Sequence, residues 1–270
     1  MNTNAVAEPS LRVLTPMPDG SCSVSATALE ALKHTHRNRE TWMRAVNRLS
    51  NNVSAICRGK VSDGKASAEA TALQKLLRKG KVDDPHLTAI AGPLLEAEAI
   101  LRAHYDGATA ELEALTVELP GLAFVDSTPG LGRLGFAQLL AEAGHLCGYS
   151  HAWKLWRRFG VGADQVAGGK LPHTVRSKRR RVVLYRVSDA LLKCKASPYR
   201  ALYLAEKARE REQAEALGIR IVPQGQKAAC IKKGEDVLTV LQVHRRAIRH
   251  AERELLSDLW AAFCADCQGS

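Results

Sequence analysis

The segment from Asp126 to Gly144 carries the residues with the clearest chemical potential, because it has the pattern of a helix-hairpin-helix. It begins Asp126-Ser-Thr-Pro-Gly130-Leu-Gly132 and continues into an apolar helical stretch. In such a motif, unpaired backbone N–H groups at the start of the second helix can bind a phosphate without a specific side chain. We expect Gly130 and Gly132 to supply a positive φ or a close backbone approach, and Arg133 to add positive charge. A Gly-rich turn that simply joins two helices is the alternative interpretation.

A run of basic residues is the second stretch with chemical potential. Between Lys170 and Arg200 there are ten Lys and Arg residues and a single acid, Asp189. The centre of the run is formed by Arg176, Lys178, Arg179, Arg180 and Arg181. Cations on a folded surface neutralise phosphates and release counterions, and the resulting affinity does not depend on base sequence. The run therefore predicts a nucleic-acid-binding surface, and the alternative is an incidental or localisation-type basic patch.

Metal ligation is the third chemistry to consider. Of the seven cysteines, only Cys264 and Cys267 have the spacing of metal ligands. A tetrahedral zinc site needs two further ligands, but the sequence has no second Cys-x-x-Cys pair, and His244 and His250 would have to fold back onto this one. We therefore predict no metal site and interpret the pair as part of a cysteine-bearing helix end. Most cysteines are expected to be buried as small apolar residues in a reducing compartment.

Composition limits the classes of protein to which these residues can belong. The 270 residues carry a formal net charge of +11 and are 46% hydrophobic, which argues against disorder. Aromatic residues make up 5%, which disfavours a β-sandwich. No apolar run approaches the length of a membrane span, and the first residues lack the features of a signal peptide. The sequence predicts a cytoplasmic protein with no membrane partner.

Two long helices are predicted in the first half of the chain. The first covers about residues 25–58 and has a basic side, and its apolar pattern pauses near His36. The second carries a heptad-like apolar seam from Leu87 through Ile90 to Leu119. With a short helix near residues 68–78 between them, they predict an antiparallel coiled-coil hairpin or a dimerising stalk, and the alternative is an ordinary bundle core. We expect a homodimer or a higher oligomer.

The predicted fold class is mainly α, with long coiled-coil-like helices followed by a helical domain that contains the helix-hairpin-helix. The expected divisions are an N-terminal arm over residues 1–25, a coiled-coil region over 26–119 and a C-terminal domain over 120–270. In the last, helices are predicted from Ser150 to Gly160, from Pro198 to about Ala216, and over about residues 235–263. A short strand is predicted at residues 219–222. The aromatic residues of the helix predicted from Ser150 to Gly160, which are Trp153, Trp156 and Phe159, are expected to pack a core rather than to stack on bases.

The order of these motifs resembles the C-terminal half of the insertion-sequence transposases that include the pilin-gene invertases and bridge-RNA-guided recombinases. The resemblance covers about residues 26–263 and is strongest from Ser127 to Leu191. Its motifs are Thr128-Pro-Gly-Leu-Gly132, Leu139-Leu-Ala-Glu-Ala-Gly144, Tyr149-Ser-x-Ala-x-x-Leu155, Ser177-Lys-Arg179 and Ala251-Glu-Arg-Glu-Leu-Leu256. The resemblance implies a role in DNA transposition or site-specific recombination, with DNA and a guide RNA as partners.

The chain departs from that family at both of its catalytic centres. The family has an N-terminal RuvC-like domain with a DEDD metal site, whereas about 25 residues precede Ala26 here and Asp19 is the one Asp among them. No cofactor is therefore evident, and Mg²⁺ is expected only if a partner supplies the nuclease site. The family's nucleophilic serine is expected before the basic run, but residues 162–176 contain no serine. Thr174 and Ser177 are the nearest hydroxyls, so the catalytic residue stays unassigned and Ser177 is a weak candidate.

Three functions remain open at this point. The first is a transposase-like nucleic-acid-binding protein that lacks independent strand cleavage. The second is an active recombinase that uses Ser177 or works with a separate nuclease subunit. The third is a non-enzymatic helical assembly protein. The first predicts that replacing Arg179, Arg180 and Arg181 together by Ala weakens nucleic-acid binding across sequences, and that Gly132→Val harms binding more than stability.

Overall fold

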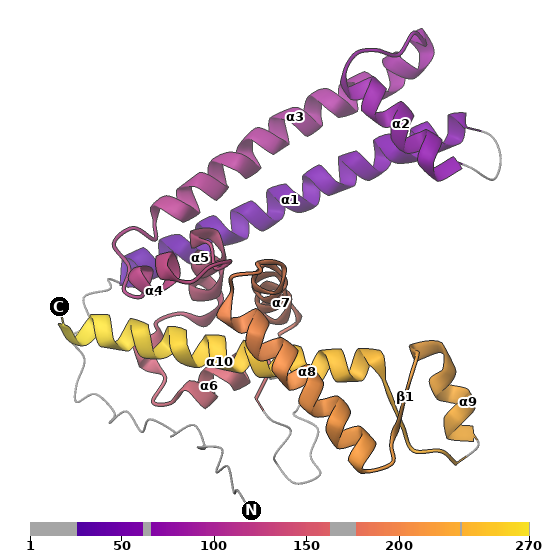
Figure 1. The fold of residues 1–270 in the computed structure, drawn as a ribbon. Helices are drawn as coiled ribbons and strands as arrows, with labels where there is room; N and C mark the ends of the chain where they lie inside the picture. Colours follow the sequence, from indigo (N-terminus) through magenta and orange to yellow (C-terminus); the bar gives the residue numbers. More distant parts are fainter. Residues whose placement is uncertain (1–25, 62–65, 163–176, 233, 270) are drawn as a thin grey trace, which may run out of the picture. The chain divides into compact units, whose positions relative to one another are not determined.

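The computed structural model describes residues 26–61, 66–162, 177–232 and 234–269 (Figure 1). These residues form ten α-helices and one two-stranded sheet, which confirms the mainly α fold class. They divide into two compact units. The hairpin unit contains described residues 26–122 and 132–144, and the C-terminal unit contains 123–131 and the described residues from 145 onward. The expected N-terminal arm, residues 1–25, lies outside the described residues.

The hairpin unit is built on two long helices, α1 (Ala26–Lys60) and α3 (Pro85–Ala114), which run side by side in opposite directions (Figure 1). The short helix α2 (Ala66–Arg78) packs on α1, and α5 (Arg133–Ala143) packs on both long helices. Two residues fix the start of α3. The Asp84 carboxylate accepts a hydrogen bond of 2.9 Å from the Leu87 N–H, and Pro85, which follows Asp84, sets the first helical φ. Because α5 packs here, this unit takes residues 132–144 from the segment that the sequence grouped with the C-terminal domain.

The seam between the long helices is partly polar. Its apolar end is a cluster that includes Val53, Leu77 and Leu87. The predicted seam residue Ile90 is instead 46% exposed, and its neighbour Ala91 is buried. The next buried position along α3 is Glu98, whose carboxylate accepts hydrogen bonds of 2.8 Å from Arg78 and from Arg102. The heptad pattern is therefore interrupted where a paired charge takes the place of an apolar side chain.

A second polar contact between the long helices explains why the apolar pattern of α1 pauses while the helix continues. The buried Arg39 donates a 2.8 Å hydrogen bond from Nε to Thr109 Oγ1 and another from Nη2 to the Tyr105 hydroxyl. Its guanidinium also lies 4.5 Å from the centre of the Tyr105 ring. Nearby, Thr35 donates a 2.9 Å hydrogen bond to Glu111. Polar residues of α1 can thus be buried against α3 because they form hydrogen bonds with polar residues of α3. The periodicity of apolar residues does not detect such positions.

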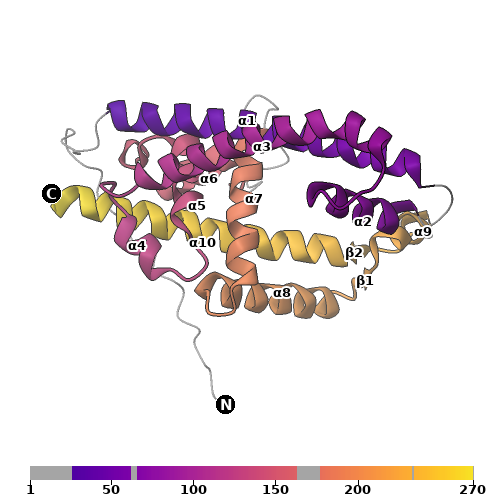
Figure 2. The same ribbon diagram turned by 90° about the horizontal axis from the view of Figure 1, so that it is seen from above.

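The C-terminal unit is arranged around one long helix, α10 (Val240–Gly269), along which α8 runs and across which α7 passes (Figure 2). Its other helices are α4 (Leu122–Ser127, in this unit from Ala123), η1 (Leu146–Gly148), α6 (Ala152–Phe159), α7 (Lys178–Lys193), α8 (Pro198–Ala216), η3 (Gln224–Gln226) and α9 (Lys227–Lys232). The core contains fully buried Phe159, Leu184, Leu255 and Phe263.

The sequence predicted the helix bounds in this unit where a terminal signal was present. Helix α8 begins at Pro198 and ends at Ala216 as predicted, and α6 ends at Gly160, whose φ of +74° is left-handed. The residue that caps α6 is His151, not Ser150. The last helix was predicted to begin near residue 235, but Val237–Thr239 forms β2, which pairs in parallel with β1 (Arg220–Val222). Because residues 237–239 pair as a strand, α10 begins only at Val240. None of the described helices combines the length and apolar character that crossing a membrane requires.

Candidate functional site

The predicted phosphate-binding turn contains one glycine whose conformation and surroundings demand glycine. Gly130 has a φ of +89°, and a Cβ atom there would lie 2.8 Å from Cys194 Cβ and 3.2 Å from Leu191 Cα. The predicted positive φ and close approach are therefore confirmed, but the atoms that approach belong to the end of α7. Gly130 lets the turn after α4 pack against α7.

Gly132 behaves differently from the prediction. It is the exposed N-cap of α5, with a φ of −82° and no atom within 4 Å of a Cβ built on it. The predicted positive φ is therefore wrong for Gly132, and no other part of the described chain approaches it closely. No side chain caps the first amides of α5 at this position, and the exposed Arg133 is the first helical residue. The backbone feature that phosphate binding needs is present, and a side chain at residue 132 would lie beside it.

The basic run forms the first turn of α7. Ser177 is its N-cap, and its hydroxyl oxygen accepts a 3.4 Å hydrogen bond from the Arg180 N–H. Lys178 and Arg179 are exposed, whereas Arg180 is half-buried. Arg176 lies outside the described residues. The Ser177 oxygen, considered as a nucleophile from sequence, therefore has a structural role at the helix start.

Arg181 is held by an internal ion pair. Its Nη1 donates a 2.6 Å hydrogen bond to Oε2 of Glu252 on α10, whose side chain is 0% exposed. Ser188 donates a 3.3 Å hydrogen bond to the other oxygen of the same carboxylate. Burial raises the pKa of Glu252, and Arg181 and Ser188 act in the opposite direction. The basic run predicted that Arg181 binds phosphate, but in the structure Arg181 anchors α7 to α10.

Helices α6 and α7 bring cations to the same tyrosine. Burial raises the pKa of Tyr149, while the charges of Arg158 on α6 and Arg180 on α7 act in the opposite direction, so both guanidiniums lie within electrostatic range of this ring. We use the name α6–α7 cations for Arg157, Arg158, Lys178, Arg179 and Arg180. All of them except the half-buried Arg180 are exposed. These cations come from two contacting helices of one folded unit, as a phosphate-binding surface requires.

The aromatic residues of α6 divide between core and surface. Phe159 is buried, as predicted, and Trp156 Nε1 donates a 3.2 Å hydrogen bond to Ser257 on α10. Trp153 is 44% exposed, and the Arg157 guanidinium lies 5.6 Å from its ring centre. The prediction that all three pack a core is therefore wrong for Trp153. An exposed tryptophan beside an arginine can stack on a base.

A cluster of His and Cys side chains lies where η1 meets α10. One ligand atom each from His145, Cys147 and Cys267 lies within 4.8 Å of the others. The thiols of Cys147 and Cys264 also share a hydrogen bond, and burial raises the pKa of both, that of Cys264 to about 12. Cys267 is disulfide-bonded in this structure. The Cys264 and Cys267 pair thus has His and Cys neighbours that sequence analysis did not find, because they come from a distant part of the chain.

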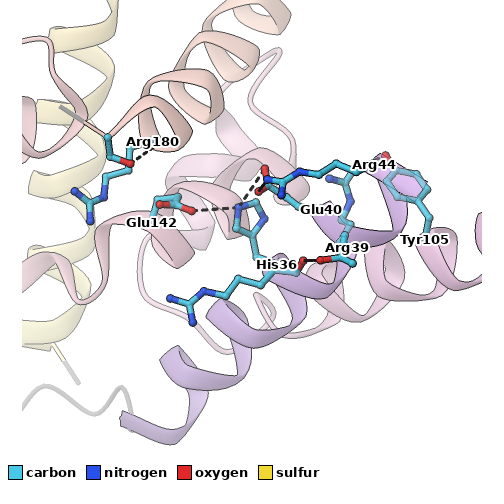
Figure 3. Close-up of polar contacts among 10 residues, drawn as sticks. His36, Arg39, Glu40, Arg44, Tyr105, Glu142 and Arg180 are labelled. Carbon is cyan, nitrogen blue, oxygen red and sulfur yellow. Dashed lines mark hydrogen bonds and ion pairs between the residues drawn. The ribbon is translucent and has the colours of Figure 1, made fainter. Parts of the chain in front are cut away.

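A buried His and two carboxylates connect α1 to α5 in the hairpin unit (Figure 3). His36 and Glu142 are both buried, with His36 Nε2 3.5 Å from Glu142 Oε1. Glu40 Oε1 lies 4.0 Å from the same nitrogen, and Arg44 donates a 3.3 Å hydrogen bond to Glu40. Glu142, the glutamate of the Leu139–Gly144 motif, therefore helps to hold α5 against α1 inside the hairpin unit.

His244 takes part in a contact between helices α10 and α8. Its Nδ1 lies 2.8 Å from the Tyr203 hydroxyl on α8, and the two rings meet edge to face. Burial, with the charges of Lys207 and Arg245, lowers the pKa of His244 below its usual value. The unfolded chain therefore binds a proton at this residue more readily than the folded chain does.

The lowered pKa of His244 predicts a loss of stability on the acid side. As the pH falls below about 6.5, protonation of the unfolded state weakens folding. His244→Gln, which cannot titrate there, is expected to lose less stability between about pH 7.5 and about pH 5.5. Urea unfolding of the variant and the native chain at both pH values measures the difference. An equal loss in the two proteins would contradict the assignment.

Comparison of the chain with protein-family models, with curated proteins and with solved structures finds no match.

Proposed function

We propose that this chain is a transposase-like nucleic-acid-binding protein that acts in DNA transposition or site-specific recombination and does not cleave strands on its own. Its ligand is DNA, with a guide RNA as a second partner, and the α6–α7 cations bind the phosphates. The proposal includes a cytoplasmic location and a homodimer or higher oligomer. The observation that carries it is that exposed cations gather on two contacting helices of one folded unit, Arg157 and Arg158 on α6 and Lys178 and Arg179 on α7.

The ion pair of Arg181 supports this role by fixing the start of α7. Because Glu252 holds Arg181 on α10, the first turn of α7 has a set orientation, and Lys178 and Arg179 are exposed on that turn. Cations that are already positioned lose less conformational entropy when they bind a phosphate. Contacts of this kind fix the position of a nucleic acid and give affinity without reading base sequence.

The same geometry favours binding over cleavage. The Ser177 oxygen accepts the hydrogen bond that caps α7, and replacing a capping serine by Ala costs about 1 kcal/mol of stability. Ser177→Ala is therefore expected to be somewhat less stable and to bind nucleic acid as the native chain does. Strand cleavage by the native protein that disappears in Ser177→Ala, with binding intact, would favour the recombinase instead.

The test is an electrophoretic mobility shift with duplex DNA, single-stranded DNA and structured RNA at two salt concentrations. The test variant replaces Arg158, Lys178 and Arg179 by Ala and leaves the fold-stabilising Arg181 in place. We expect its affinity to fall at least about tenfold, because three phosphate contacts are lost. The fall of log affinity with log salt should also become less steep, by about 0.9 for each lost contact.

A charge-matched variant separates a local site from the effect of net charge. Replacing the exposed Arg48, Arg211 and Lys232 by Ala also removes three positive charges, from positions outside α6 and α7. The proposal requires this variant to bind as the native chain does. Equal losses in the two variants would mean that diffuse charge carries the binding. No binding by the native chain to any of the three ligands would favour a helical assembly protein.

A further inference from the structure

The His and Cys cluster of the C-terminal unit brings together three potential metal ligands, His145, Cys147 and Cys267, and Cys264 contacts one of them, Cys147. His145 and Cys147 lie at η1 with one residue between them, and Cys264 and Cys267 lie in the last turns of α10 with two residues between them. We propose that in the reduced protein these four side chains bind one Zn²⁺ ion. Three thiolates and one imidazole form one of the usual tetrahedral zinc sets.

The distances in the cluster are close to those that a zinc ion needs. Zn–S bonds of about 2.3 Å and Zn–N bonds of about 2.0 Å place tetrahedral donor atoms about 3.5 to 3.8 Å apart. The donor atoms of His145, Cys147 and Cys267 already lie within 4.8 Å of one another. Cys264 reaches the same group through its hydrogen bond with Cys147. Adjustments of about 1 Å would bring these three donors to zinc distances, and Cys264 would have to turn from Cys147 towards the same ion.

Both elements that carry the ligands are held in place by contacts outside the cluster. Trp260 Nε1 donates a 3.1 Å hydrogen bond to the Tyr149 carbonyl, which joins α10 to the residue after η1. The His145 ring packs edge to face on Phe263, with ring centres 5.6 Å apart. The buried Nε2 of His145 has no hydrogen-bond partner among the described residues. An unpartnered buried nitrogen beside thiols is a polar group that a metal ion would satisfy.

Zinc binding requires that the disulfide of Cys267 be reduced first. A thiol reductant supplies two electrons and two protons, becomes a disulfide itself and leaves two protein thiols. Zn²⁺ then replaces the proton on each of the three cysteines that it binds, so three protons are released. With all four positions filled by protein, no position remains for substrate, and the ion would clamp the end of α10 to η1.

The experiment measures zinc bound by the full-length chain after reduction with a phosphine and removal of unbound metal. Elemental analysis is expected to find about one Zn²⁺ per chain. Replacement of zinc by Co²⁺ is expected to give intense d–d bands of a tetrahedral ion and strong thiolate-to-cobalt charge-transfer bands. The spectrum of the native chain reports the thiolate ligands without any substitution, so the test does not depend on whether a variant folds.

Variants then assign the ligands. Cys264→Ser and His145→Gln are each expected to weaken zinc binding at least about 100-fold, since even the loss of a group behind a ligand costs 10- to 100-fold. Cys194→Ser is the control, because Cys194 is a free, half-buried thiol like Cys147 but lies outside the cluster, and this variant should bind zinc as the native chain does. The site is refuted if the reduced native chain retains no zinc, if Cys264→Ser binds it unchanged, or if the chain with its disulfide intact binds it equally well.

Discussion

Replacing Arg181 by Ala is expected to lower the free energy of unfolding by about 3 kcal/mol. The Glu252 side chain is 0% exposed, whereas Arg181 is 32% exposed, so the substitution leaves a buried carboxylate without its cation. An ion that loses its partner inside a protein keeps its desolvation penalty and loses the attraction that offset it. Urea unfolding followed by circular dichroism measures the change. Arg179→Ala, two residues away on α7 and exposed, is the control and should change stability by less than about 0.5 kcal/mol.

The loss is also expected to depend on pH. Burial raises the pKa of Glu252 above its usual value, so the folded chain holds this proton more tightly than the unfolded chain, and stability falls as the pH rises from about 4.3 through the folded pKa. Removing Arg181 removes a charge that lowers the pKa of Glu252, so the pH range over which stability falls extends to higher pH. The deficit of Arg181→Ala should therefore be larger at about pH 7.5 than at about pH 5.

A second substitution identifies the buried charge as the cause. Adding Glu252→Gln to Arg181→Ala removes the ionisable group and keeps a side chain that can pair with Ser188. The double variant should recover most of the lost stability at neutral pH and lose the pH dependence. A deficit that is the same at both pH values, and that Glu252→Gln leaves unchanged, would show that Arg181 stabilises the fold by packing alone.

Gly130→Ala is expected to be similarly damaging, with a loss of about 3 kcal/mol. The new Cβ would lie 2.8 Å from Cys194 Cβ and 3.2 Å from the backbone of Leu191, at a residue whose φ is +89°. Backbone strain and overlap with α7 therefore act together, and the backbone atom cannot rotate away. Thermal or urea unfolding measures the effect, and the relevant unit is the C-terminal one, which contains both sides of the contact.

Gly132→Ala provides the control two residues along the same turn. Its Cβ would enter open space at a φ of −82°, so we expect a loss below about 1 kcal/mol, the difference between Gly and Ala at an N-cap. If both alanine variants were equally stable, the close contact between Gly130 and α7 would be contradicted. A larger side chain at residue 132, as in Gly132→Val, should affect nucleic-acid binding more than stability if the amides of α5 contact a phosphate.

Local signals in the sequence predicted much of the helical fold. Pro198 sets the start of α8, Gly160 ends α6, and apolar spacing predicted both long helices. These signals act over a few residues, so a sequence displays them directly. The start of α10 was predicted wrongly because β2 forms through pairing with β1, a contact between segments that local propensity does not describe.

The candidate sites were less predictable because their partners come from distant elements. The basic run was evident, but the assignment of Arg181 depended on Glu252. A signal for that contact existed: Ile248, Leu255 and Leu256 lie on the same side of α10 as Glu252, and a charge on an apolar face needs a partner. The Cys264 and Cys267 pair gave half of a ligand set, and no spacing rule connects it to His145 and Cys147.

The position of α10 in the chain has a consequence for synthesis on the ribosome. Helices α6, α7 and α8 all pack on α10, yet they leave the ribosome before it does. Until α10 emerges, buried residues such as Phe159 and Leu184 lack the surface that covers them. The nascent C-terminal unit therefore exposes apolar side chains throughout this interval, whereas α1 and α3 can already form their hairpin.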